Sequence, residues 1–362
     1  MSDPFGPRQD RLLAALDERG LGAMLVTGSA NVRYLTGYIG SNGIAVIGAG
    51  GRVLITDSRY AVSAAEQVRG AEVVVGRRDL LADVAAAAPA IAAGRPLGIE
   101  ADDLTLARHE RLVEMLPGVE MTPTRSLVEE LREVKDDAEI ATMREAAAVV
   151  DRALASVLEH GLIGRTERDV AFALHGAMLA EGAQEPSFAT IVASGPRGAR
   201  PHHVPGPDPV PADTLVVIDM GAVVDGYCSD MTRTVATGPL PARLAEIYAV
   251  CLDAQEAALA AAAPGMTGAD LDAVARARIA AAGYGECFGH GLGHGVGLVI
   301  HEQRRPEGRD GDHDRARHLP RGRGRGADRG PDRVGGGGRA TAVAHLQAAD
   351  DRRMRSTRGR RP

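Results

Sequence analysis

Two aspartates in one short segment are the first candidates for chemistry. Asp219 follows the apolar run TLVVI, and Asp230 lies eleven residues later in the segment IDMGAVVDGYCSDMTRT. The Asp225-Gly226 pair between them is typical of a tight hairpin turn, so adjacent strands can bring the two carboxylates together. Two carboxylates at close range repel each other unless a cation lies between them. The segment therefore predicts a cation site, whereas Asp213 and Asp225 are interpreted as solvated turn residues.

Histidines cluster in a second segment, which reads FGHGLGHGVGLVIH. His290, His294 and His301 are spaced 4 and 7 residues apart, with glycines between them. This glycine content disfavours a helix and allows the backbone to approach another group closely. A lone histidine is usually a hydrogen-bonded core residue, but three at this spacing weaken that interpretation. The Pro-rich segment ARPHHVPG adds His202 and His203.

Two aspartates and a histidine form a mixed oxygen and nitrogen donor set. Such a set suits Mn²⁺, Co²⁺, Zn²⁺ or Fe²⁺. The remaining histidines can move protons, because the ordinary pKa of histidine lies near neutral pH. The sequence thus predicts a metal-dependent site built from distant segments.

Hydrophobic periodicity predicts an α/β domain in the first part of the chain. Helical spacing occurs at residues 8–20, 58–70, 80–94 and 105–118. Short apolar runs indicate strands at residues 22–28, 43–48, 52–57, 71–76 and 96–100. A long helix then begins, with Asp136 or Asp137 as its cap and Glu139 in its first turn, and we place the domain boundary there.

The second part of the chain is expected to be an α+β domain, with helices covering a mostly antiparallel sheet. Thr166 is the expected cap of a helix that ends at Gly182. A strand follows at residues 187–195, and residues 214–235 are expected to form two strands around the Asp225-Gly226 turn. Further helices are expected at residues 241–265 and 267–283.

Composition excludes several classes of protein. Apolar residues make up 44% of the 362 residues, enough for a sizeable core. The N-terminal segment lacks the features of a signal peptide, and no run of 18 apolar residues occurs, so we expect a cytoplasmic protein without a membrane partner. The three widely spaced cysteines, Cys228, Cys251 and Cys287, are expected to be reduced thiols.

Five stretches of the chain occur in the order found in one enzyme family. They read NVRYLTGY, ITDSRY, TIVASG with PHH, IDMGAVVDGYCSDMTRT and GHGLGHGVGLVIHE. The chain therefore resembles the pita-bread metallopeptidases, which comprise Xaa-Pro aminopeptidase, prolidase and their non-peptidase relative creatinase. The resemblance implies an α/β creatinase/prolidase-like N-terminal domain at residues 1–132 and an α+β pita-bread catalytic domain at residues 137–302.

The resemblance also implies a ligand set. Two divalent metal ions, Mn²⁺ before Co²⁺, Zn²⁺ or Fe²⁺, would be bound by the chain. Asp230 would bridge them, Asp219 would hold one and His294 the other. The metals would bridge a hydroxide and polarise the scissile carbonyl.

Three further histidines are implied to act on the substrate. His202, His290 and His301 would surround it and stabilise or protonate the tetrahedral intermediate. The substrate would be a peptide with proline at its second position, cleaved by an aminopeptidase or dipeptidase that forms a homodimer. Two alternatives stay open: a creatinase-like hydrolase of a small C–N bond, which the Asp-Asp-His set disfavours, and a catalytically dead binding homologue.

The sequence departs from this family after His301. Residues 303–362 carry 17 arginines and eight acidic residues, a formal charge of +9, and contain no aromatic residue. The family would place two metal-binding glutamates here, in segments reading like TIEPG and VRIED, and neither EPG nor RIED occurs. A basic disordered tail that binds nucleic acid is one interpretation, but it would have no aromatic side chains on which bases could stack. We therefore expect no nucleic-acid partner.

A change of reading frame explains the same region better. Asp310–Pro320 can be encoded so that a one-base shift reads MVTTIEPGIY. In the same phase, residues 326–334 can read VRIEDRI and residues 341–351 can read RRLLTSKPLT. The sequence thus predicts an aberrant Arg/Gly-rich, disordered tail at 303–362 and an effectively truncated catalytic domain. A chain with this tail is expected to bind metal weakly, aggregate and show little activity.

Overall fold

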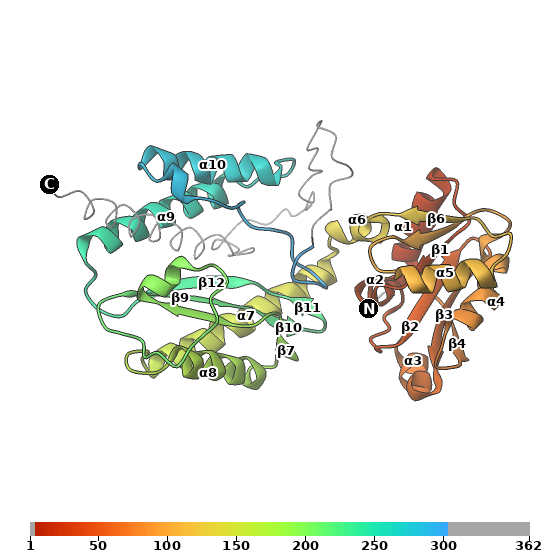
Figure 1. The fold of residues 1–362 in the computed structure, drawn as a ribbon, viewed down its shortest axis with the longest axis horizontal. Coiled ribbons are helices and arrows are strands. Elements are labelled where there is room, and N and C mark those ends of the chain that lie inside the picture. The colour runs from red at the N-terminus through yellow and green to blue at the C-terminus, as the bar shows by residue number, and fades with distance from the viewer. Residues whose placement is uncertain (1–3, 303–362) are drawn as a thin grey trace. The chain divides into compact units, whose positions relative to one another are not determined.

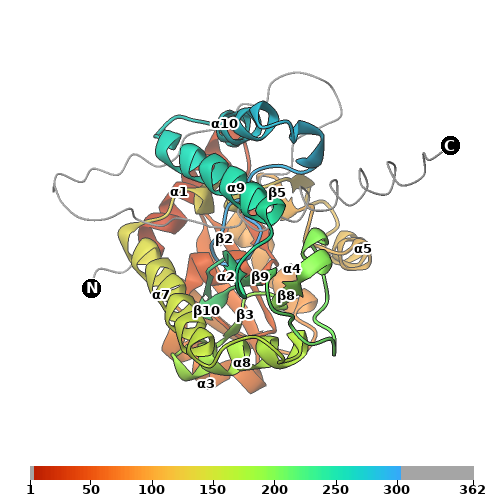
Figure 2. The ribbon, with the colours of Figure 1, turned by 90° about the vertical axis from the view of Figure 1, so that its left-hand side faces the viewer.

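The computed structural model describes residues 4–302, and the prediction of a disordered tail at 303–362 lies outside them. Contacts divide the described residues into two compact units, one ending at Val134 and the other spanning Lys135–Glu302. Figure 1 and Figure 2 show the helices and strands of both. No helix within residues 4–302 combines the length and the apolar character that crossing a membrane would require.

The first unit is a six-stranded sheet covered by helices. Its strands are β1 Ala23–Val26, β2 Gly43–Gly48, β3 Gly51–Asp57, β4 Glu72–Gly76, β5 Leu97–Glu100 and β6 Met121–Thr124. Its helices are α1 Phe5–Glu18, α2 Ser29–Thr36, α3 Ala61–Gln67, α4 Leu81–Ala92, α5 Leu106–Met115 and α6 Leu127–Glu133. The strand order is β4-β3-β2-β1-β5-β6, antiparallel at β1–β2 and β2–β3 and parallel elsewhere.

Side chains alternate between the two faces of this sheet. Leu25, Val46 and Ile55 belong to one buried cluster with residues of α4 and α5. Their sequence neighbours Met24 and Leu54 are buried as well, so both faces of the sheet are covered. The α/β prediction for this part of the chain is confirmed.

Helix α2 is one of three elements of this unit that the sequence did not predict, with strand β6 and the separate short helix α6. Its segment SANVRYLT is rich in residues of low helix propensity. The helix forms because the buried carboxylate of Glu100 accepts the backbone N–H groups of Thr27 and Gly28 just before its first turn, at 2.6 and 2.7 Å. Gly37, with φ 79°, ends it.

The second unit contains two small antiparallel sheets and four helices. The strands are β7 Glu185–Pro186, β8 Ile191–Ser194, β9 Leu215–Met220, β10 Ala222–Val224, β11 Tyr227–Cys228 and β12 Met231–Ala236. The helices are α7 Asp137–Glu159, α8 Glu167–Ala180, α9 Ala242–Ala261 and α10 Gly268–Ala281. The sheet orders are β12-β9-β8 and β11-β10-β7. In Figures 1 and 2, α7 and α8 lie on one side of β8, β9 and β12, and α9 and α10 lie on the other.

Capping explains where the two helices beside the sheet begin. Asp136 accepts the N–H of Glu139 at 2.9 Å, and the Glu139 carboxylate accepts the N–H of Asp136 at 2.8 Å. Thr166 accepts the N–H of Asp169 at 3.0 Å. Both predicted helix starts are confirmed.

Residues 214–236 form four short strands, so the prediction of two strands is wrong. The predicted hairpin turn exists between β10 and β11, where Asp225 and Gly226 have φ 40° and 69°. The chain changes sheet at Gly221, where any Cβ would collide with the carbonyl oxygen of Ser229. This crossing splits what would have been one long hairpin into two paired segments.

Candidate metal centre

Strands β9 and β12 position the two candidate aspartates. Asp219 lies on β9 directly opposite Thr232 on β12, and Asp230 lies just before β12 begins. The Thr232 hydroxyl donates to Oδ1 of Asp219 at 2.6 Å. The antiparallel register of this one strand pair therefore fixes both carboxylates at the same end of the sheet.

His294 reaches the aspartates from the glycine-rich segment. Its Nε2 lies 3.2 Å from Oδ2 of Asp230, and its Nδ1 donates to the carbonyl oxygen of Gly295 at 3.0 Å. That second contact leaves Nε2 as the nitrogen that faces Asp230. The His301 ring lies beside it, tilted by 48°, with ring centroids 4.3 Å apart. Two aspartates and two histidines thus gather from three segments of the chain.

The side chains of this cluster shift one another's pKa values. Burial raises the pKa of the Asp219 carboxyl to about 6, the negative charge of Asp230 adds to this, and the Thr232 hydrogen bond opposes it. The hydrogen bond to Asp230 raises the pKa of His294. Burial lowers the pKa of His301, and the positive charge of His294 lowers it further.

The types of these residues suit a divalent cation, and the ligand atoms of Asp219, Asp230 and His294 do not all lie within 4.8 Å of one another in this structure. Two carboxylates and one imidazole nitrogen are donors that first-row divalent metals accept. A cation beside Asp219 would offset the unfavourable burial of its charge, which the raised pKa records.

The other two candidate histidines differ in their surroundings. His202 is exposed, on the loop after Gly195–Ala199. His290 is held beside α10: its Nδ1 donates to Gly291, its ring meets Phe288 edge-on at 4.9 Å, and its carbonyl accepts Arg276 at 2.9 Å.

Glu302 holds the glycine-rich segment in place, and the sequence analysis did not identify it. Its carboxylate accepts the Leu298 N–H at 2.9 Å and the Lys135 ammonium at 2.6 Å, and its own N–H donates to Gly295 at 2.9 Å. The Cys228 N–H donates to the carbonyl of Gly297 at 2.8 Å, which joins the segment to β11. Glu302 itself gives no local signal in the sequence; only its partner stands out, because Lys135 is the single lysine beside 41 arginines.

A second acidic group lies in the first unit and was also missed. Oxygens of Glu100, Asp103 and Glu129 lie within 4.8 Å of one another, and no other three acidic, histidine or cysteine residues among the described ones are this compact. Asn31 donates to Glu100 at 2.8 Å and to Glu129 at 2.6 Å. The Asn31 amide and the N–H groups of Thr27 and Gly28 all donate to carboxylates of this acidic group. We therefore interpret the group as a network that anchors the start of α2.

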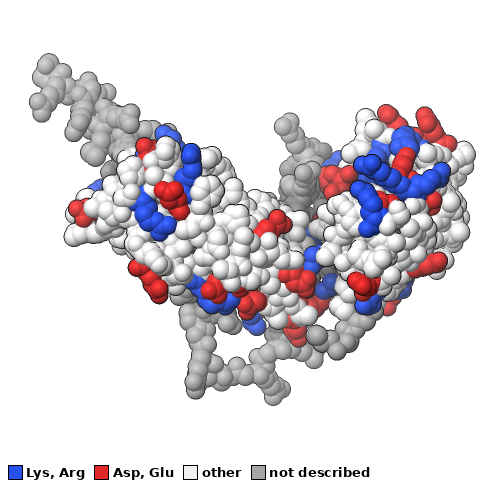
Figure 3. Space-filling model, turned by 90° about the horizontal axis from the view of Figure 1, so that it is seen from below, with Lys and Arg blue, Asp and Glu red and all other residues white. Residues whose placement is uncertain are grey.

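Surface charge is mixed. Figure 3 shows acidic and basic side chains intermingled over the face that it draws.

Comparisons with known proteins identify both parts of the chain. Residues 141–323 match the model of metallopeptidase family M24, and residues 8–134 match the creatinase/prolidase N-terminal domain. The uncharacterized peptidase YqhT of Bacillus subtilis is 40% identical over 81% of this chain and 83% of its own length. The Xaa-Pro dipeptidase of Pyrococcus horikoshii is 32% identical over 83% of this chain and 84% of its own.

Solved structures agree. The Xaa-Pro dipeptidase of Bacillus anthracis superposes with a TM-score of 0.79 at 38% identity, covering 82% of this chain and 83% of that one. The prolidase of Pyrococcus horikoshii superposes with a TM-score of 0.76 at 32% identity, covering 82% and 83%. The fold is thus the α/β creatinase domain followed by a pita-bread catalytic domain. The chain belongs to metallopeptidase family M24, a family of metal-dependent hydrolases of the prolidase type.

Proposed function

We propose that the site around Asp219, Asp230 and His294 hydrolyses the Xaa-Pro bond of a peptide with proline at its second position. The observation that carries this proposal is the His294 imidazole 3.2 Å from Asp230, at the end of the sheet that also carries the partly buried carboxylate of Asp219. The Xaa-Pro dipeptidases among the relatives supply the substrate class.

Each residue has a defined part in this proposal. Asp219, Asp230 and His294 would hold divalent metal, with Mn²⁺ as the first choice. When bound, the metal supplies a Lewis acid for the carbonyl and a nucleophile from water at neutral pH. His301, whose pKa is lowered by burial, is neutral at neutral pH and able to accept or donate a proton. His202 and His290 would contact the substrate.

The family's last two glutamate ligands are, in this proposal, encoded in the neighbouring reading frame. The charge change after His301 and the IEPG and RIED readings in one phase support it. A chain with the present residues 303–362 then binds metal weakly, aggregates and turns over slowly, because fewer ligands offset the repulsion between Asp219 and Asp230.

Hydrolysis of Gly-Pro, with Gly-Ala as the control dipeptide, tests the activity. A chain with the frame restored after residue 302 should cleave Gly-Pro with Mn²⁺ and lose activity with a chelator. Asp230→Asn and His294→Ala should each lower kcat/KM at least about 100-fold. His175→Ala, at an exposed position on α8, should leave it unchanged. Equal cleavage of both dipeptides, or activity that survives the chelator, would contradict the proposal.

A further inference from the structure

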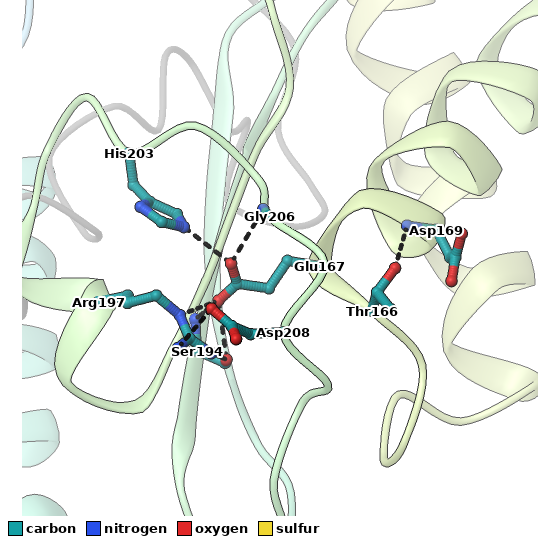
Figure 4. Close-up of polar contacts among 8 residues, drawn as sticks. All are labelled: Thr166, Glu167, Asp169, Ser194, Arg197, His203, Gly206 and Asp208. Atoms are coloured by element: carbon teal, nitrogen blue, oxygen red, sulfur yellow. Dashed lines mark hydrogen bonds and ion pairs between the residues drawn. The ribbon is translucent and has the colours of Figure 1, made fainter.

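One carboxylate outside the candidate metal centre is unusually rich in hydrogen bonds. Glu167 is the first residue of α8, and its side chain is 0% exposed. Its Oε1 accepts the Ser194 N–H and hydroxyl, both at 2.8 Å, and the Arg197 Nε–H at 2.7 Å. Its Oε2 accepts His203 Nε2 at 2.8 Å and the Gly206 N–H at 3.3 Å. Figure 4 shows these donors converging on one side chain.

All five donors belong to one stretch of chain, between the end of β8 and Gly206. The backbone of α8 holds the far end of the same stretch, since Glu167 N–H donates to Asp208 at 3.1 Å and Arg168 N–H donates to Gly206 at 3.0 Å. Arg197 also reaches the Asp208 carboxylate at 3.2 Å. The loop is therefore tied to the first turn of α8 along its whole length.

The charge of Glu167 suits this task. Burial raises the pKa of its carboxyl, but the hydrogen bonds from His203, Ser194 and Arg197 outweigh burial and lower it to about 2. The N-terminal end of α8 also favours a negative charge at this position. A glutamine at residue 167 would turn its NH₂ group toward either the Gly206 N–H or the Ser194 N–H and Arg197 donors, so only the carboxylate accepts every bond.

This loop carries His202, the residue next to His203. His203 is fixed by Glu167, and only 9% of its side chain is exposed, while its neighbour His202 is exposed. We infer that Glu167 is a positioning residue: by holding Ser194, Arg197, His203 and Gly206 it sets the position of the loop that carries His202, the residue to which the proposed function assigns a substrate contact. The inference rests on the proposed function for the role of His202, but the placement of the loop can be measured without activity.

The test compares Glu167→Gln with Glu181→Gln in the full chain. Glu181 pairs with Arg152 on the surface, so its substitution removes a carboxylate without touching the loop. In Glu167→Gln, amide hydrogen exchange of residues 195–206 should rise at least about tenfold, and acylation of His202 by diethyl pyrocarbonate should change at least about threefold. Glu181→Gln should alter neither. Unchanged exchange and acylation in Glu167→Gln would overturn the inference.

A second pair of variants guards against misfolding and separates positioning from a purely structural role. His203→Ala removes one donor, and His203→Gln supplies another N–H in its place. In the frame-restored chain, His203→Ala and Glu167→Gln should lower kcat/KM for Gly-Pro about tenfold, as His202→Ala does, and His203→Gln should recover most of the loss. Full kcat/KM in both variants, despite low kcat/KM in His202→Ala, would overturn the inference.

If the frame-restored chain does not hydrolyse Gly-Pro, the proposed function fails. The exchange and acylation measurements then still decide whether Glu167 places His202.

Discussion

Lys135 and Glu302 form a partly buried ion pair, with Nζ 2.6 Å from Oε2 and side chains 13% and 8% exposed. Lys135 precedes the cap of α7, and Glu302 follows the last candidate histidine. The pair therefore ties the glycine-rich segment to the start of the long helix. The Glu302 carboxylate also accepts the Leu298 N–H, so one side chain fixes both ends of the turn after His294.

Lys135→Met should destabilise the protein. It removes the cation beside a buried carboxylate, which typically costs about 3 kcal/mol or more. Urea unfolding at neutral pH measures the loss. Arg95→Met is the matched control, because its partner Asp17 is exposed, and that pair should contribute less than about 1 kcal/mol. Equal losses in the two variants would show that the Lys135–Glu302 pair does not hold the segment.

Thr232→Val tests the hydrogen bond to Asp219. The buried hydroxyl donates to a carboxylate, so its removal should cost about 2 kcal/mol at pH 8, where Asp219 is ionised. Thr234→Val is the control on the same strand, because the Thr234 hydroxyl is buried without a hydrogen-bond partner. Thermal unfolding of the metal-free protein should show a lower midpoint for the first variant and no loss for the second. The reverse order would contradict the assigned geometry.

Acid should unfold the protein partly through Glu167. Its folded pKa of about 2 lies below the ordinary 4.5, so its stabilisation is complete above about pH 5 and is lost as the pH falls toward 2. The loss amounts to about 3 kcal/mol. Urea unfolding across this range should give a flatter pH dependence for Glu167→Gln than for the parent, whereas Glu181→Gln should keep the parental slope. A parental slope in Glu167→Gln would rule out this contribution.

Asp219 should act in the opposite direction. Its folded pKa of about 6 lies above the ordinary 3.8, so the metal-free protein loses stability as the pH rises from about 4 through 6. Relative to Asp219→Asn, the parent should lose about 3 kcal/mol across this range. Mn²⁺ added to the frame-restored chain at pH 7.5 should recover the loss. A parent whose stability tracks that of Asp219→Asn at every pH would contradict the burial of this charge.

Much of the fold could be predicted from local signals. Asp136 and Thr166 begin their helices because their side chains satisfy N–H groups three residues on, and that spacing is visible in the sequence. Helix α2 could not be predicted, since its N-terminus depends on Glu100, about seventy residues later in the chain. The change of sheet at Gly221 could not be predicted either, because it depends on which strands pair.

The candidate site also contains some residues that could be predicted from the sequence and others that could not. Asp219, Asp230 and His294 could be proposed from residue type and spacing, and the family resemblance added roles for them. Glu167 and Glu302 could not be proposed, because their partners lie 27 to 39 and 167 residues away in the sequence. A lone buried glutamate gives no local signal; only the folded chain shows what it holds.

Sequencing the gene from codon 285 to its stop codon tests most directly the claim that residues 4–302 belong to a complete two-metal peptidase. We predict a one-base change of frame after codon 302 that restores IEPG and RIED in one phase. A confirmed frame encoding the present residues 303–362 would contradict the claim, and the chain would then be a family member without its last two glutamate ligands.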